Sequence, residues 1–272
     1  MKLNKLLLLL GIIAFSFTAC DEYSAGERWE TIPPSQIKKN VLIEDFTGQK
    51  CSNCPKAAET AHNIQTTFGA DHIIVVAMHG GSLSASADSD EQGLANNESK
   101  AYNERFMGKN SYPMGSVDRG VVTKHDQWSN TALKRLTVQP KVDLSINSND
   151  IAYDAATHKL NLKVGVKANA DVTGKLQVWL IEDGVVAYQE TPEDIVFDYT
   201  HNHVFRATLN GMDGDELTLS HQQTVQKEYT YTLPDFSVWK NNTPWNVQHL
   251  SVVAFYYNAS DGVMQVISQK VQ

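Results

Sequence analysis

Two cysteines three residues apart, Cys51 and Cys54, form a Cys-x-x-Cys pair, a spacing typical of thiol–disulfide chemistry. Pro55 follows directly and is typical of the first turn of a helix, where its missing N–H needs no partner. The free N–H groups and positive dipole end of this helix would stabilise a thiolate at Cys51, and Lys50 adds a positive charge. Cys54 would then attack a mixed disulfide at Cys51 and release the partner.

A strand before the pair and a helix after it are expected to position the two cysteines. Residues 40–46 alternate between apolar and polar and predict a strand, with Asp45 on its otherwise apolar face. Residues 54–68 carry apolar side chains at helical spacing. Residues 72–79 form a continuous apolar run, which fits a central strand covered on both faces. Strand, helix and strand in this order predict a right-handed parallel unit.

The spacing of Asp45 and the cysteines resembles the thioredoxin fold, in which a buried aspartate precedes the first cysteine by six positions. The resemblance implies that Asp45 relays protons, that Cys51 attacks and that Cys54 resolves. It also implies that Pro113 is the cis-proline that faces the cysteines and helps to hold an extended substrate. A trans proline at a strand edge is the alternative. Lys50 replaces the aromatic residue usual before the first cysteine, so the substrate stays open.

Residues 80–110 are not part of a minimal thioredoxin fold. Within them, residues 88–107 are polar with scattered apolar positions and predict an inserted helical region near the active site. Its first acidic residues, Asp88, Asp90 and Glu91, lack the spacing and glycine of an EF-hand. A solvated start of a helix is therefore favoured over a cation site.

A short strand and a helix are expected to complete the first unit. The strand follows Pro113, and Asp126 is a candidate N-cap of a helix that ends near Arg135. We therefore expect an α/β thioredoxin-like domain over residues 37–137.

The pattern changes to period two at Val138, and residues 138–272 contain no long helical pattern. Asp183-Gly184 and Asp261-Gly262 are turn signals. Strands are expected over residues 142–146, 160–166, 176–180, 203–209, 224–233, 250–258 and 264–270. Seven short strands of this kind predict an all-β immunoglobulin-like sandwich.

The N-terminus has the layout of a bacterial lipoprotein signal. Residues 1–19 combine two lysines, an apolar run too short to span a bilayer, and small residues directly before Cys20. Cys20 would become the lipidated N-terminus, and its loss as a thiol leaves only the Cys-x-x-Cys pair of the three cysteines. An ordinary signal peptide with an incidental cysteine is the alternative. Residues 20–36 read as a tether, and the acidic pair after Cys20 favours the cell surface over the periplasmic face of the outer membrane.

The charge of the chain restricts its partners. Without residues 1–19, the chain has 21 basic and 31 acidic residues and a net charge of −10. This excess of acid argues against nucleic acid as a partner and against a polybasic membrane patch. We expect anchoring through acyl chains and a protein as substrate or surface partner.

Histidines offer the alternative of a metal site. His201 and His203 would share a face of one strand, with His221 further along. No third ligand is identifiable, so surface histidines are favoured. A zinc site at the cysteine pair, completed by His62 or His79, is disfavoured because no second Cys-x-x-Cys exists. We expect no metal and no cofactor.

The whole arrangement resembles a family of 28-kDa outer-membrane lipoproteins with a thioredoxin-like domain followed by a β-sandwich. That family is known mainly as surface lipoproteins, described as adhesins or antigens, with no agreed reaction. The resemblance therefore leaves two functions open. One is a lipid-anchored protein that exchanges disulfides with exported or surface proteins. The other is a surface binding or adhesion lipoprotein that binds through its sandwich and has a structural disulfide.

Overall fold

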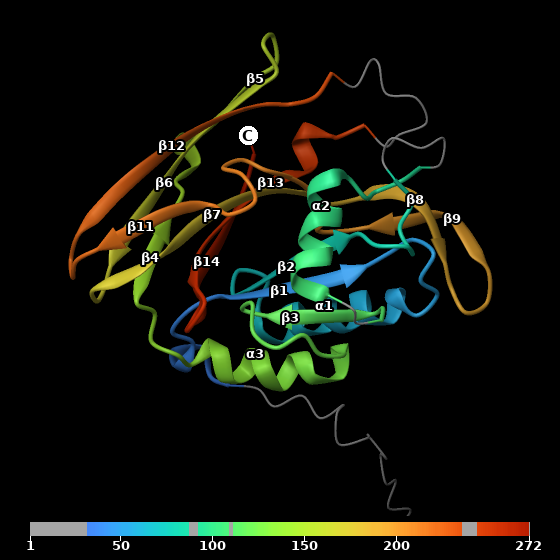
Figure 1. The fold of residues 1–272 in the computed structure, drawn as a ribbon, viewed down its shortest axis with the longest axis horizontal. Helices are drawn as coiled ribbons and strands as arrows, with labels where there is room; N and C mark the ends of the chain where they lie inside the picture. The colour runs from blue at the N-terminus through green and yellow to red at the C-terminus, as the bar shows by residue number, and fades with distance from the viewer. Residues whose placement is uncertain (1–31, 87–91, 109–110, 236–243, 272) are drawn as a thin grey trace, which may run out of the picture.

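The computed structural model describes residues 32–86, 92–108, 111–235 and 244–271, and strands dominate this part of the chain. The strands form an eight-stranded sheet, a four-stranded sheet and a two-stranded sheet (Figure 1). The expectation of a β-rich fold is confirmed. Three expected features lie wholly or mostly outside the described residues: the signal over residues 1–19, the lipidation at Cys20 and the tether over residues 20–36. Among the residues described, no helix has the length and apolar character needed to cross a bilayer.

The expected strand–helix–strand unit is present. Strand β1 (Val41–Thr47) pairs in parallel with β2 (Ile73–His79), and helix α1 (Cys54–Phe68) connects them. Strand β3 (Met114–Val117) pairs antiparallel with β1. The predicted last helix is a 3₁₀ turn, His125–Gln127, followed by α3 (Trp128–Leu136).

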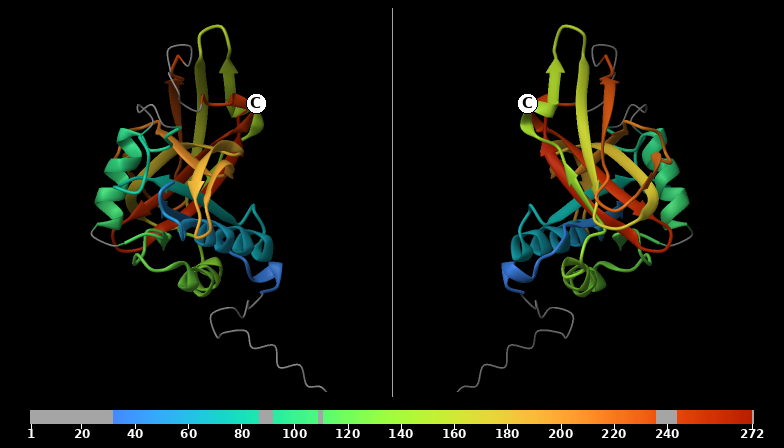
Figure 2. Two further views of the ribbon diagram at one scale, coloured as in Figure 1. Left: turned by 90° about the vertical axis from the view of Figure 1, so that its right-hand side faces the viewer. Right: turned by 90° about the vertical axis from the view of Figure 1, so that its left-hand side faces the viewer.

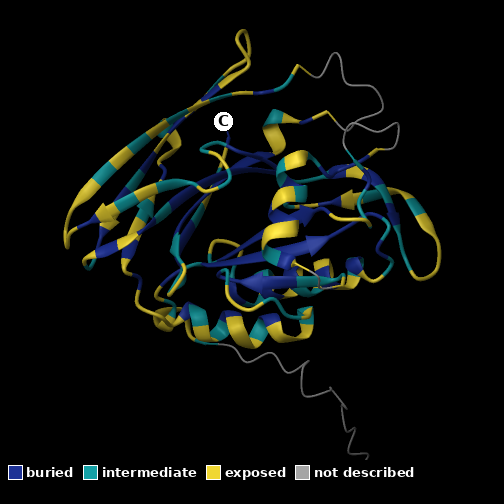
Figure 3. Cartoon of the chain, viewed as in Figure 1, coloured by how far each residue is buried: buried dark blue, intermediate teal, exposed yellow. Residues whose placement is uncertain are grey.

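Helix α1 packs on β1 and β2 through side chains spaced one turn apart. Ala57, Ala61 and Ile64 are buried, and they contact Val41 and Ile43 in one apolar cluster. The opposite face of β1 belongs to a second cluster, so both faces of this strand are covered. The continuous burial of β1 and β2 follows from this position between two layers (Figure 3).

The inserted region between β2 and β3 contains a short helical segment. Helix α2 spans Asn97–Tyr102, and a π-helical turn follows over Asn103–Met107. Asn96 caps α2, because its side chain accepts a hydrogen bond from the Ser99 amide and the Ser99 hydroxyl accepts one from the Asn96 amide. Residues 87–91, which carry the acidic cluster considered above, lie outside the described residues.

The second half of the chain consists of strands, and all seven expected ones are present. They are β4 (Val142–Ser145), β6 (Lys159–Ala168), β7 (Val172–Glu182), β10 (Val204–Thr208), β12 (Thr224–Thr232), β13 (Leu250–Asn258) and β14 (Gly262–Lys270). Four more strands were not predicted: β5 (Ile151–Asp154), β8 (Val185–Glu190), β9 (Ile195–His201) and β11 (Asp215–Leu219).

Two of the sheets pack face to face. The four-stranded sheet has the order β12-β6-β4, with β5 also paired to β6. Alternate residues of β6 point into an apolar core shared with β7, β13 and β14 of the larger sheet. The hairpin of β5 and β6 extends beyond the rest of the molecule (Figure 2). The period-two pattern therefore predicted the buried face of this layer correctly.

The eight-stranded sheet continues across residues 137 and 138, where we expected one unit to end and another to begin. Its order is β14-β13-β7-β10-β2-β1-β3, and β10 pairs in parallel with β2 through Val204 and Ala77. The core on one face is shared as well, because Phe46 belongs to the same cluster as Trp179 and Phe205. Pairing with β10 removes the open edge that β2 would otherwise expose.

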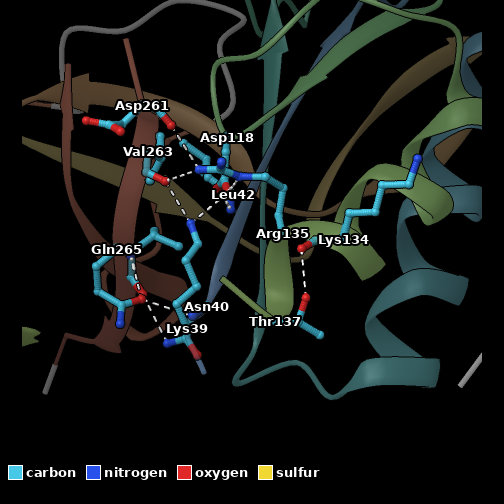
Figure 4. Close-up of polar contacts among 11 residues, drawn as sticks. Lys39, Asn40, Leu42, Asp118, Lys134, Arg135, Thr137, Asp261, Val263 and Gln265 are labelled. Atoms are coloured by element: carbon cyan, nitrogen blue, oxygen red, sulfur yellow. Dashed lines mark hydrogen bonds and ion pairs between the residues drawn. The ribbon is translucent and has the colours of Figure 1, made fainter. Parts of the chain in front are cut away.

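A buried ionic network also joins the two halves (Figure 4). The Lys39 ammonium donates to Asp118 Oδ2 and to the Val263 carbonyl, each at 2.7 Å. Arg135 Nε donates to the same Asp118 oxygen at 2.6 Å, and its Nη2 donates to the Val263 carbonyl at 2.8 Å. Asp118 Oδ1 accepts the amide hydrogen of Leu42. The start of β1 is thereby bound to β14, which comes from the far end of the chain.

Candidate functional site

A disulfide joins Cys51 to Cys54, with 5.4 Å between the two Cα atoms. Cys54 is the first residue of α1, and Cys51 lies in the turn between β1 and α1. The Cys51 amide donates to the Gly48 carbonyl, and the Cys54 amide donates to the Cys51 carbonyl. The sequence therefore placed the pair correctly between a strand and a helix.

Asp45 lies on the face of β1 that is covered by α1. The side chain is 2% exposed, and its Oδ1 has no hydrogen-bond partner in the described part of the chain. Burial raises the pKa of Asp45 to about 7. The position of Asp45 on an otherwise apolar strand face predicted this burial, which is confirmed. A carboxyl that titrates near neutrality is suited to take and return a proton.

Asp45 and Cys54 line the same cavity, which has a volume of about 240 Å³. The cavity lies between α1, the ends of β1 and β2, and residues 199–203 at the end of β9. Glu59 and His62 contribute from α1, and Tyr199 from β9. None of its described lining residues is a lysine or an arginine.

Two histidines meet in this cavity. His79 ends β2 and His201 ends β9, and their ring centroids are 5.3 Å apart at an interplanar angle of 74°. Burial lowers the pKa of His79 well below its usual value and lowers the pKa of His201 to about 4. His79 Nδ1 is buried and has no hydrogen-bond partner in the described residues. Both rings are therefore neutral at neutral pH.

The expected pairing of His201 with His203 on one strand face is wrong. Strand β9 ends at His201, and His203 has a φ of 58°, so the backbone turns between them. The His203 ring lies 3.0 Å from Asp183 and 3.1 Å from Gln65, and His221 lies exposed in a separate turn. The described residues contain no group of three histidine, cysteine or acidic side chains placed to hold a metal ion.

The hairpin of β8 and β9 lies against the turn that carries Cys51. The Gln189 side-chain amide donates to the Cys51 carbonyl at 3.0 Å and to the Gly48 carbonyl at 3.3 Å. The Glu190 amide donates to the Gln49 carbonyl at 2.7 Å. Cys51 is only 4% exposed as a result. Sequence analysis missed this contact, since the hairpin follows Cys51 by more than 130 residues (Figure 1).

Pro113 directly precedes β3, and its peptide bond with Tyr112 is cis. Strand β3 pairs with β1 up to Met114 and Phe46, so Pro113 lies just beyond this pair, on the side of the turn that leads to Cys51. Pro113 does not line the cavity with Cys54 and Asp45. The expected site residues are thus split, with Asp45 and Cys54 on the cavity and Cys51 and Pro113 outside it.

Comparison with known proteins identifies the family of this chain and a solved structure with a similar fold. The family model for outer membrane protein Omp28 matches residues 99–272, which begin after the disulfide. HBP35 of Porphyromonas gingivalis superimposes with a TM-score of 0.64 and 13% identity, covering 86% of this chain and 76% of that chain. Spo0M of Bacillus subtilis reaches a TM-score of only 0.32 at 15% identity, over 49% of each chain. No curated protein matches the sequence.

Proposed function

Because this chain belongs to the outer membrane protein Omp28 family, we propose that it acts at the outer membrane, where it exchanges disulfides with exported or surface proteins. The observation that carries the redox part is the cavity lined by both Asp45 and Cys54, one of the two cysteines of the disulfide. A buried carboxyl with a pKa of about 7 beside a disulfide can hold the proton that exchange consumes or releases.

The reaction runs through a mixed disulfide. In the reduced protein, the Cys51 thiolate attacks a disulfide of the partner, and one partner sulfur leaves as a thiolate. Asp45 takes the proton of Cys54, whose thiolate attacks Cys51 and releases the second partner sulfur. Cys51 and Cys54 end as the disulfide seen in the structure, and the partner ends with two thiols. Pro113 would hold the backbone of the partner next to Cys51.

The order of elements supports a finer assignment of the fold. Residues 37–137 would be a thioredoxin-like unit, supported by the element order β1, α1, β2, β3, α3 and by the strand order β2-β1-β3. Residues 138–272 would be an immunoglobulin-like sandwich, supported by two sheets packed around one core. The similarity to HBP35, with a TM-score of 0.64 over 86% of this chain, supports a shared fold.

Lipid anchoring is the second part of the proposal. Cys20 would carry the acyl chains after removal of residues 1–19, and residues 20–36 would hold the folded part away from the bilayer, on the cell surface. The support is the sequence of the N-terminus together with the outer-membrane family.

A second function has one observation in its favour. Cys51 is 4% exposed, and Gln189 binds its carbonyl. Burial of this kind is typical of a structural disulfide, which is what a surface binding protein would have. The two functions differ in the stability of the disulfide. Structural disulfides of exported proteins have reduction potentials below about −300 mV, and working couples have higher ones.

The decisive experiment is a redox titration of the mature chain, followed by an insulin-reduction assay. We expect a potential above about −300 mV, activity in the native protein and none in the Cys51→Ser variant. The Gln189→Ala variant should reduce insulin faster, because Cys51 loses part of its cover. Gln248→Ala is the matched control, because it removes an exposed glutamine far along the chain from the cysteines, and it should reduce insulin at the native rate. A potential below about −300 mV without insulin reduction would establish the structural disulfide instead.

A further inference from the structure

The two sulfurs of the disulfide have different surroundings. Cys54 lines the 240 Å³ cavity, whereas Cys51 does not, and the turn that carries Cys51 is bound by Gln189. Ligand sites for drug-sized molecules occupy about 300–1,000 Å³. The cavity beside Cys54 is smaller, so it has room for a molecule of a few heavy atoms and none for a folded protein.

Two buried polar atoms of the cavity lack partners in the described residues. They are Asp45 Oδ1 and His79 Nδ1, and both side chains are 2% exposed. A buried polar atom without a hydrogen bond destabilises the folded state. The residues that border the cavity therefore include two polar groups whose hydrogen bonds are not completed within the described part of the chain.

The charge of the lining selects among small molecules. Asp45 and Glu59 supply two carboxyl groups, and no lysine or arginine lies among the described lining residues. His79 and His201 are neutral at neutral pH, because burial lowers the pKa of each. A cationic group is therefore favoured in this cavity, and a carboxylate or other anion is disfavoured.

We propose that this cavity binds a low-molecular-weight thiol that carries an amino group, and that this thiol reduces the disulfide by attacking Cys54. The proposal rests on the proposed function, for which it supplies the reductant. The protein partner would react at Cys51, and the small thiol would react at Cys54, which lines the cavity.

The chemistry favours attack on Cys54. The thiolate of the small molecule bonds to Cys54 Sγ, the Sγ–Sγ bond breaks, and Cys51 leaves with the electron pair. A leaving thiolate of lower pKa leaves faster, and Cys51 lies at the positive end of the α1 dipole. A second small thiol then attacks the bound one, forms a small disulfide and releases Cys54 as a thiolate. Asp45 returns a proton to Cys54, so two small thiols are oxidised for each protein disulfide reduced.

Three thiols of similar size test the charge preference: cysteamine, 2-mercaptoethanol and 3-mercaptopropionate. The protein used is the oxidised mature chain that carries Cys20→Ser, and the rate at which each thiol reduces it is measured. Each rate is then divided by the rate at which the same thiol reduces 2-hydroxyethyl disulfide. This ratio cancels differences in nucleophilicity among the thiols. We expect cysteamine to exceed 3-mercaptopropionate by at least about tenfold. Glu59→Lys, at an exposed position of α1, should abolish this preference, and Glu193→Lys, outside the cavity, should leave it intact.

Two single-thiol variants locate the attack. In the same background, Cys54 of the Cys51→Ser variant should form a mixed disulfide with cystamine at least about ten times faster than Cys51 of the Cys54→Ser variant. Equal rates for all three thiols, or faster modification of Cys51, would overturn the inference. Insulin reduction could still be present in that case, so the proposed function would stand. Failure of both insulin reduction and small-thiol reduction would remove the two together.

Discussion

Replacing Asp45 with asparagine should flatten the dependence of stability on pH. The carboxyl has an ordinary pKa of 3.8 in the unfolded chain and a pKa of about 7 in the folded protein, because it is fully buried. The folded state therefore holds this proton more tightly than the unfolded state does. The resulting stabilisation is complete below pH 3.8 and is lost as the pH rises toward 7.

The size of the effect follows from the two pKa values. At 1.36 kcal/mol per unit, the shift corresponds to about 4 kcal/mol at pH 8 and to about 0.5 kcal/mol at pH 4. The stability of Asp45→Asn relative to the native protein should therefore rise by about 3–4 kcal/mol between these pH values. His79 and His201 act in the opposite sense, since their lowered pKa values remove stability as the pH falls. They are present in both proteins and cancel in the difference.

Urea unfolding of the two oxidised proteins from pH 4 to pH 8 measures this difference. Glu59→Gln is the matched control, since Glu59 lines the same cavity from an exposed position and its replacement should change stability by less than about 0.5 kcal/mol. Parallel stability curves for native protein and Asp45→Asn would refute the reasoning. Asp45 would then be too well solvated to serve as the proton store beside Cys54.

Three further outcomes are expected. Cys20→Ser should release the protein from the outer-membrane fraction, and a variant that stays bound would show that the anchor lies elsewhere. Asp118→Ala should lower the free energy of unfolding by about 3–5 kcal/mol, because Lys39 stays buried without its partner. As a control, Asp213→Ala breaks an exposed ion pair and should lower the free energy of unfolding by less than about 1 kcal/mol. Equal losses in the two variants would contradict this prediction. A fragment that ends at Thr137 should show no cooperative unfolding transition by circular dichroism. The fragment lacks β10, which covers the edge of β2, and it lacks half of the apolar cluster on that face of the sheet. A sharp transition would show instead that the fragment folds independently.

Local sequence patterns predicted the elements around the cysteines well. The expected helix over residues 54–68 has those bounds in the structure, and Asp45 is buried as expected. His79 was considered only as a zinc ligand for the cysteine pair. Its place near Asp45 could also have been predicted, because it ends the strand parallel to β1, and the carboxyl ends of parallel strands meet at one edge. These features depend on neighbours in sequence or on a short crossover.

The β8–β9 hairpin was missed because its pattern is inverted. Gln189 and His201 point inward and are almost fully buried, whereas Phe197 is 75% exposed. Apolar residues normally mark the buried face of a strand, so the usual reading assigns this hairpin the wrong inner face. Val185 and Ala187 are also buried on this inner face. The burial of Gln189 and His201 is explained by the carbonyls and the histidine that they contact, which lie on distant parts of the chain.

The central position of β10 shows why the division into two units could not be judged from sequence. All five of its residues are buried, and Arg206 among them looks like a solvent-facing residue in a period-two pattern. Its guanidinium instead donates to Glu182 of β7 at 2.7 Å, with both side chains 3% exposed. A buried pair of this kind costs several kcal/mol when one partner is lost, so it fixes which strand lies beside β10. Strand β10 has β7 on one side and β2 on the other. The half of the chain that covers Cys51 therefore also completes the sheet on which Asp45 lies.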